Sequence, residues 1–251
     1  IAQGRVSVNG YIITELPVWV DPQQDRIEVN GQPLTRPRQT RRASRTGRAA
    51  QAGKHYVMLH KPRNVVSTVR DPQGRRTVLD LVHLPDHPRL FPVGRLDADS
   101  TGLILLTDDG ELANRLTHPR YGVAKTYQAS VRGRLTEQDL DRLRHGIYLS
   151  PSPKAASAGP RAKRATMEQV RIVGYQRDRQ RNDRTQLAIT LREGQNRQIR
   201  RMLARLGVKV RRLKRVAIGP LQLKGLAVGQ WRRLTSAEVK ALQQAAGLEP
   251  S

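Results

Sequence analysis

Carboxylates are concentrated in one short segment of a strongly basic chain. The segment GRLDADSTGLILLTDDG, residues 94–110, contains Asp97, Asp99, Asp108 and Asp109. The whole chain of 251 residues has 46 Lys and Arg against 21 Asp and Glu, which gives a net charge of +25. An ionised carboxylate can act as a nucleophile, exchange protons or bind a metal ion. Which of these roles each carboxylate can fill depends on its spacing and on the elements around it.

Residues 97–108, DADSTGLILLTD, partly match a calcium-binding loop. Acids at positions one and three, Gly102 at position six and Ile104 at position eight fit the pattern. Position twelve, however, is Asp108 instead of the Glu that binds calcium through both oxygens. Residues 103–107, LILLT, also look like a strand, where the motif needs a loop and a helix. Calcium binding is therefore disfavoured.

A pair of carboxylates is also what most glycoside hydrolases use. Asp97 and Asp99 are only two residues apart, which is close for groups that act on opposite faces of a sugar. A net charge of +25 also suits neutral glycans poorly. A glycosidase is therefore disfavoured as well.

Asp108 and Asp109 are expected to cap a helix, whereas Asp97 is the candidate for chemistry. Asp108 and Asp109 follow the strand and precede GELANRL, and Asp108 with Glu111 resembles a capping box. Asp97 lies in a turn ahead of the strand, where loop residues commonly do chemistry. If this segment is extended, Arg95 shares a face with Asp97.

The elements that would position Asp97 are mixed in type. Two apolar stretches, HYVMLHKP (55–62) and LILLT (103–107), are predicted to be buried strands. Three segments have helix start and stop signals: residues 135–146, 196–207 and 234–247. Strands and helices do not follow a regular βαβ alternation, so the predicted fold class is α+β with a largely antiparallel mixed sheet.

The predicted helices have specific signals. Thr136 and Thr235 are candidate N-caps, each with an acid three residues later, and Gly146 and Gly247 follow the helix ends. The middle helix has one apolar face, formed by Ile199, Met202, Leu203 and Leu206.

The chain divides into three blocks. Residues 1–34 contain RVSVNG and DRIEVNG, two alternating patterns that each end in Asn-Gly and predict a strand with a tight turn. Residues 35–53 contain six arginines and no acid, which predicts a flexible linker that could also bind phosphates. Residues 54–251 form the main domain, with a surface loop at 150–165 and a hairpin tip at 176–184.

Composition limits the function classes. A charge of this size attracts polyanions, chiefly nucleic acid. An anionic membrane surface is the weaker option, and no membrane is expected among the partners. The sequence has no stretch of 18 apolar residues and no signal-peptide pattern, so it has no predicted membrane span. The absence of cysteine excludes disulfides, thiolate nucleophiles and cysteine-bound zinc. Aromatic residues make up only 4%, which disfavours recognition of single strands by rows of stacked rings.

Residues 94–127, GRLDADSTGLILLTDDGELANRLTHPRYGVAKTY, resemble the signature of the ribosomal RNA pseudouridine synthases of the RsuA type. Three further segments resemble parts of that family in the right order: LHKPRNVVST (59–68), LREGQNRQIRRMLARLG (191–207) and RLKRVAIGPLQLKGLAVGQWRRLTSAEV (212–239). Residues 1–34 resemble the C-terminal part of the small RNA-binding domain of ribosomal protein S4. The leading helices of that domain do not precede them, so we expect the native chain to start before Ile1.

The resemblance implies an activity. A member of this family isomerises uridine to pseudouridine in ribosomal RNA and uses no cofactor and no metal. The partner implied is ribosomal RNA or a ribosome assembly intermediate, and we expect a monomer that acts in the cytoplasm. A non-catalytic RNA-binding or ribosome-assembly factor with the same fold is the alternative.

The resemblance also implies residue roles. Asp97 matches the catalytic aspartate, Tyr127 the tyrosine that stacks on the target base, and Arg200 the basic residue that pairs with the aspartate. Arg95 matches an arginine that helps displace the target base, and Lys125 is placed among the substrate-binding residues. The presence of Asp97, Tyr127 and Arg200 together argues against the non-catalytic alternative. Other arginines near Arg200 are expected to be solvated surface charges: Arg197, Arg201 and Arg205.

Two positions depart from the family pattern. Gln195 stands where the family usually has arginine, which puts one phosphate or substrate contact in doubt. Asn64 stands where the family usually has glycine, and Asn tolerates the positive φ that such a turn needs.

Overall fold

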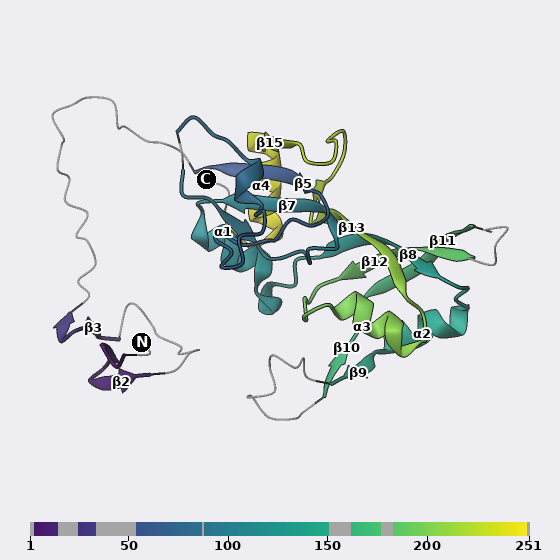
Figure 1. Ribbon diagram of the computed structural model, residues 1–251, viewed down its shortest axis with the longest axis horizontal. Helices are drawn as coiled ribbons and strands as arrows, with labels where there is room; N and C mark the ends of the chain where they lie inside the picture. The colour runs from purple at the N-terminus through teal and green to yellow at the C-terminus, as the bar shows by residue number, and fades with distance from the viewer. Residues whose placement is uncertain are drawn as a thin grey trace. The chain divides into compact units, whose positions relative to one another are not determined.

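The computed structural model describes residues 3–14, 25–33, 54–86, 88–150, 162–176 and 183–249. The chain separates into two compact units, residues 1–52 and 53–251 (Figure 1). The predicted linker at 35–53 lies outside the described residues, as do most of the predicted loop at 150–165 and the tip of the hairpin at 176–184.

The first unit contains a small antiparallel sheet with the strand order β2-β1-β3-β4. Asn9 and Gly10 (φ 51° and 85°) connect the first two strands, and Asn30 and Gly31 (φ 52° and 71°) connect the last two. Both turns predicted from Asn-Gly pairs are therefore confirmed. The described part of this unit contains no helix, and its assignment to the S4 type stays a prediction. The strands are β1 (Val6–Val8), β2 (Tyr11–Ile13), β3 (Ile27–Val29) and β4 (Gln32–Pro33).

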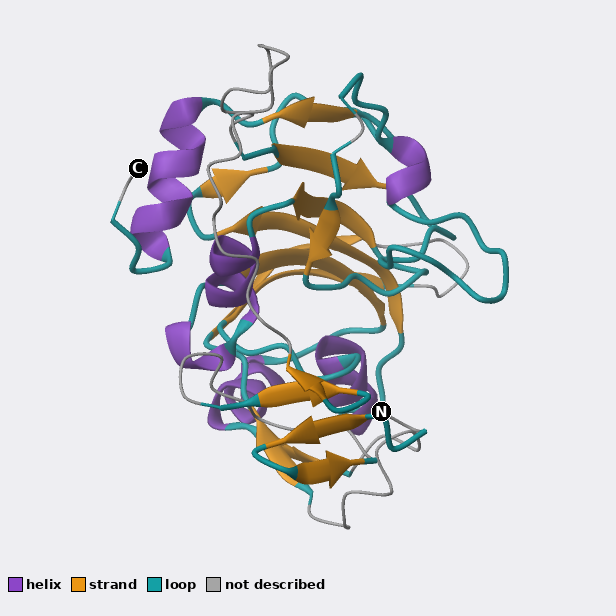
Figure 2. Ribbon diagram, turned by 90° about the vertical axis from the view of Figure 1, so that its left-hand side faces the viewer, coloured by secondary structure: helices purple, strands orange, loops and turns teal. Residues whose placement is uncertain are grey.

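The second unit is built on a sheet of nine strands with the order β11-β12-β8-β13-β7-β5-β15, in which β6 also pairs with β7 and β14 with β13. Figure 2 shows these strands side by side in a curved sheet with helices packed against it. The strands are β5 (Tyr56–Lys61), β6 (Phe91–Val93), β7 (Thr101–Thr107), β8 (Lys125–Arg132), β11 (Gln169–Gln176), β12 (Arg184–Leu191), β13 (Val210–Ile218), β14 (Leu221–Gln222) and β15 (Trp231–Arg233). A separate two-stranded sheet contains β9 (Ile147–Leu149) and β10 (Lys163–Ala165).

One strand pair in the large sheet differs from the others. Strands β7 and β13 run parallel, with Thr101 opposite Lys214 and Gly102 opposite Arg215, while the other described strand pairs are antiparallel. The predicted α+β fold with a largely antiparallel mixed sheet is confirmed.

The helices begin and end close to the predicted positions. They are α1 (Gly110–Thr117), α2 (Glu137–His145), α3 (Gln198–Arg205) and α4 (Ser236–Ala245), and two short 3-10 helices cover Leu79–Leu81 and Pro119–Tyr121. Both predicted capping boxes are present, at Thr136 with Asp139 and at Thr235 with Glu238.

The apolar stretches of β5 and β7 are continuous because both faces of this part of the sheet are covered. Met58, Leu103 and Leu105 belong to the core cluster under α1 and α4, whereas Leu59 and Ile104 belong to a cluster on the other face. A third cluster joins β8, β11, β12 and β13 to α2 and α3. The beginning of β7 and the beginning of α3 are thus both anchored by buried residues.

Of the two acids that follow β7, Asp109 has the predicted capping role and Asp108 does not. Asp109 is the N-cap of α1, because its carboxylate accepts a hydrogen bond from the Leu112 amide at 3.1 Å. Asp108 instead accepts hydrogen bonds from the amide and the Nδ1 of His55, each at 2.8 Å. The predicted capping box of Asp108 with Glu111 is wrong, because α1 starts one residue later and Asp108 faces β5.

The ring of His55 is held between two carboxylates, and this predicts a pH-dependent stability. Its Nε2 lies 2.5 Å from Asp86 Oδ2, and the hydrogen bond with Asp108 raises the pKa of His55 above 6.5 although burial opposes this. A raised pKa stabilises the fold fully below the unfolded-state pKa, and the contribution is lost as pH rises through the folded-state pKa. His55→Gln should therefore cost about 1 kcal/mol of unfolding free energy at pH 6 and clearly less at pH 9. Urea denaturation at both pH values measures this, and an equal cost at both would mean that the imidazole acts only as a neutral donor.

Candidate active site

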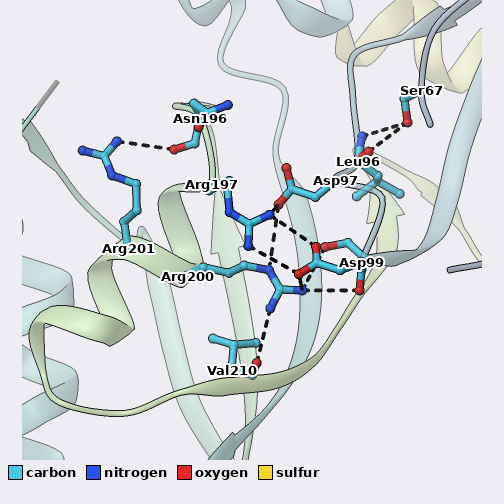
Figure 3. A network of polar contacts seen from close by, with 10 residues as sticks. Ser67, Leu96, Asp97, Asp99, Asn196, Arg197, Arg200, Arg201 and Val210 are labelled. Atoms are coloured by element: carbon cyan, nitrogen blue, oxygen red, sulfur yellow. Dashed lines mark hydrogen bonds and ion pairs between the residues drawn. The ribbon is translucent and has the colours of Figure 1, made fainter. Parts of the chain in front are cut away.

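Asp97 lies in the turn that leads into β7, and neighbouring segments fix this turn. The Ser100 amide donates to the Asp97 carbonyl at 3.0 Å. On the other side, the Ser67 hydroxyl donates to the Leu96 carbonyl at 3.0 Å and accepts from the Leu96 amide at 3.1 Å (Figure 3). The Asp97 side chain is 28% exposed, so its carboxylate is accessible while its backbone is held.

The segment after β5 also supports this turn. Asn64 has φ 62°, and its amide donates to the Ala98 carbonyl at 2.7 Å, so the expectation that Asn preserves this turn is confirmed. Lys61 is fully buried, and its ammonium donates to the carbonyls of Val65 at 2.7 Å and Pro62 at 2.8 Å. Burial lowers the pKa of Lys61 to about 8, while Asp97 and Asp99 oppose this shift.

Arg200 of α3 contacts Asp97, the pairing that the resemblance predicted. Its Nε lies 3.8 Å from Asp97 Oδ2, and its Nη2 lies 3.2 Å from Asp99 Oδ2 (Figure 3). The same Nη2 donates to the Ser100 hydroxyl at 3.3 Å, and Nη1 donates to the Val210 carbonyl at 3.3 Å. The side chain is only 12% exposed, so Arg200 is held in one position between the turn and β13.

Arg197 joins the same network, and the prediction that it is a solvated surface charge is wrong. Its Nη1 lies 3.2 Å from Asp97 Oδ2 and its Nη2 lies 3.3 Å from Asp99 Oδ2. Because α3 begins at Gln198, Arg197 is the N-cap residue, and its left-handed conformation (φ 47°) turns the side chain off the helix surface toward the carboxylates. Arg201 and Arg205 contact no carboxylate within the described ranges and reach Ser150 instead.

A pocket opens beside the Asp97 carboxylate. Asp97, Arg95, Tyr127 and Arg200 contribute to its wall, together with Arg197, Gln195 and apolar residues such as Leu191, Ile199 and Leu213. Tyr127 packs against two of the three core clusters, and this fixes its ring at the pocket wall. The structure thus brings four of the five predicted site residues together.

Lys125, the fifth, is not among the residues that line this pocket. It is two residues before Tyr127 on β8 and is half-buried. Burial lowers the pKa of Lys125 to about 8, and the nearby Arg215 adds to this shift.

The arrangement suits organic acid–base or nucleophilic chemistry at one carboxylate. Two guanidinium groups contact the carboxylate, and Tyr127 lines the same pocket. Within the described parts of the chain, no three His, Asp or Glu side chains are arranged to hold a metal ion. The same parts contain no helix that is long and apolar enough to cross a membrane.

Comparisons with known proteins identify the family. Residues 55–205 match the family model described as RNA pseudouridylate synthase. An "Uncharacterized RNA pseudouridine synthase" from Aquifex aeolicus is 39% identical over 99% of this chain and 88% of its own length. The "Ribosomal large subunit pseudouridine synthase B" of Bacillus subtilis is 38% identical over 97% of this chain and 87% of its own length. A solved structure titled "Crystal structure of pseudouridylate synthase" has a TM-score of 0.63 at 29% identity and covers 96% of this chain and 90% of that chain. The family model, the relatives and the matching fold together show that the chain belongs to the RNA pseudouridylate synthase family, whose members are isomerases that act on RNA.

Proposed function

We propose that this enzyme converts specific uridines of ribosomal RNA to pseudouridine and that Asp97 is the catalytic carboxylate. The observation that carries the proposal is the position of Asp97, which lines the same pocket as Tyr127 and is contacted by Arg200 of α3 and by Arg197, the residue just before α3. The name of the Bacillus subtilis relative supports ribosomal RNA as the substrate class. Ribosomal RNA or an assembly intermediate is then the partner, and the cytoplasm is the place of action.

The reaction exchanges one glycosidic bond for another. The bond from ribose C1′ to uracil N1 breaks, a bond from C1′ to C5 forms, the hydrogen on C5 leaves as a proton, and N1 gains a proton. A base inside a helix cannot reach Asp97, so the target nucleotide must first turn out, at a cost of a few kcal/mol. Stacking on Tyr127 would return roughly 1–3 kcal/mol of this cost. Arg95, which is exposed at the pocket wall, is placed to contact the displaced nucleotide.

Mapping of pseudouridine in ribosomal RNA tests the proposal directly. Cells that lack this protein should lose one or a few pseudouridines, and the purified enzyme should restore them in RNA from those cells. If the map is unchanged and the purified protein still binds ribosomal RNA, the non-catalytic assembly factor is the better account.

Tyr127 gives a prediction that separates its ring from its hydroxyl. Tyr127→Phe keeps the stacking face and should retain most activity, whereas Tyr127→Ala should lose roughly 10-fold or more, the equivalent of one stacking contact. Tritium release from RNA labelled at C5 of uracil measures the activity. Because the ring also packs in the core, thermal melts must show that the Ala variant is folded at the assay temperature. An inactive Phe variant that still binds RNA would point to proton transfer by the hydroxyl.

A further inference from the structure

We propose that a second hollow beside the Asp97 pocket binds the RNA phosphate backbone next to the target nucleotide. This hollow, the basic groove, lies between the turn after β5, the end of α3 and the start of β13. It is lined by Arg63, Asp99, Arg197, Arg200, Ala204 and residues 207–211. The inference rests on the proposed function and adds a binding site to it.

The basic groove has a large excess of positive charge. Five cations, Arg63, Arg197, Arg200, Lys209 and Arg211, line it against the single carboxylate of Asp99. That carboxylate is already shared by Arg197 and Arg200, at 3.3 Å and 3.2 Å. Asp97, which does not line the groove, also contacts Arg197 and Arg200. Five cations against these two carboxylates leave an excess of three positive charges, and a polyanion is the ligand that would balance them.

Three of these cations are free to bind a ligand. Arg63, Lys209 and Arg211 are exposed, and none of them contacts a carboxylate in the part of the chain that the structure describes. Burial lowers the pKa of Arg200, and the neighbouring Arg197 and Arg63 repel its charge. An exposed, unpaired cation beside other cations is stabilised when a phosphate binds, because the phosphate reduces this repulsion.

The position of the groove indicates which phosphates it would bind. Arg197 and Arg200 line both the basic groove and the Asp97 pocket, so the two hollows share one wall. A nucleotide whose base enters the pocket has a phosphate on each side of its ribose. The RNA chain that leaves the pocket across Arg197 would therefore lay its adjoining phosphates along Arg63, Lys209 and Arg211.

Two triple variants with the same loss of charge test the inference. The groove variant carries Arg63→Gln, Lys209→Gln and Arg211→Gln. The control variant carries Arg142→Gln, Arg171→Gln and Lys240→Gln, three exposed cations on α2, β11 and α4 that do not line the groove. Filter binding to ribosomal RNA at several salt concentrations gives the slope of log affinity against log salt for each protein.

The slope of the groove variant should be smaller in magnitude by about 2 than that of the wild type. Each phosphate contact to single-stranded RNA contributes about 0.7, and the variant removes three such contacts. The control variant should lose much less. In turnover assays the groove variant should have a raised KM and a kcat close to that of the wild type, since Asp97, Tyr127, Arg197 and Arg200 remain. Equal slopes for the two variants would overturn the proposal, and so would a groove variant that lowers kcat alone.

The outcome separates this inference from the proposed function. The salt slope is measured without turnover, so it can support the groove even if the wild type releases no tritium. A wild type that is active on RNA with equal slopes for both variants would instead reject only the groove. The altered side chains are exposed, so both variants should melt near the wild-type temperature. Single variants such as Arg211→Gln, with an expected loss of about 0.7 in slope, replace the triple variant if it melts early.

Discussion

Asp97→Asn should lower the rate of isomerisation by roughly 10³-fold or more, while RNA binding is retained. The amide keeps the shape of the side chain, which limits the change in packing, but removes the negative charge that contacts Arg197 at 3.2 Å. Affinity for RNA should stay equal or rise, because a negative charge that faces a phosphate-rich ligand has been lost. Tritium release from RNA labelled at C5 of uracil measures the reaction, and filter binding measures the affinity.

Two other carboxylates of the same segment are matched controls. Asp99→Asn leaves Asp97 in place but weakens the anchor of Arg197 and Arg200, so its activity loss should be clear but smaller than that of Asp97→Asn. Asp108→Asn should lower stability through the His55 contact and leave activity at the assay temperature unchanged. Equal tritium release by the wild type and Asp97→Asn would show that the catalytic assignment is wrong.

Gly102→Ala should destabilise the enzyme by roughly 2–5 kcal/mol. Gly102 has φ +112°, and a Cβ at this position would lie 2.2 Å from the backbone oxygen and 2.6 Å from the backbone nitrogen of Arg215. Backbone cannot rotate away as a side chain can, so β13 would have to move from β7 at their parallel pairing. Because Gly102 follows the Asp97 turn closely, activity should fall together with stability.

Denaturant unfolding measures this cost, and Gly110→Ala is the matched control. Gly110 begins α1, and a Cβ there would meet no atom within 4 Å. Its replacement should change the unfolding free energy by about 0.5 kcal/mol or less. If Gly102→Ala unfolds at the same denaturant concentration as Gly110→Ala, then β7 and β13 can separate at this point with little cost.

The sequence predicted the elements well where local signals decide them. The capping boxes at Thr136 and Thr235 and the two Asn-Gly turns depend on residues within a few positions of one another, and all four are present. Asp97 and Arg200 were indicated by a resemblance, and the structure places them at the same site. No periodicity could have indicated their proximity, because it depends on the pairing of β7 with β13.

The errors arose where tertiary contacts override local patterns. Asp108 and Asp109 are adjacent acids at a helix start, and only the contact with His55, just before β5, determines which of them caps α1. Arg197 has the sequence environment of an ordinary helix arginine. Its left-handed backbone just before α3 turns it to Asp97, and an Asn-Arg pair ahead of a helix is too weak a signal to predict that conformation.

The order of strands in the large sheet has a consequence for how the enzyme is made. Strand β5, the first of this unit, pairs with β15, the last, and β7 pairs with β13. Asp99 and Arg200 are 101 residues apart, so the active-site contacts form only after most of the chain has left the ribosome. Pairings over such distances fold slowly, and meanwhile the apolar edges of β5 and β7 remain open to wrong partners. The newly synthesised enzyme should therefore depend on chaperones or on low expression temperatures until its C-terminal strands arrive.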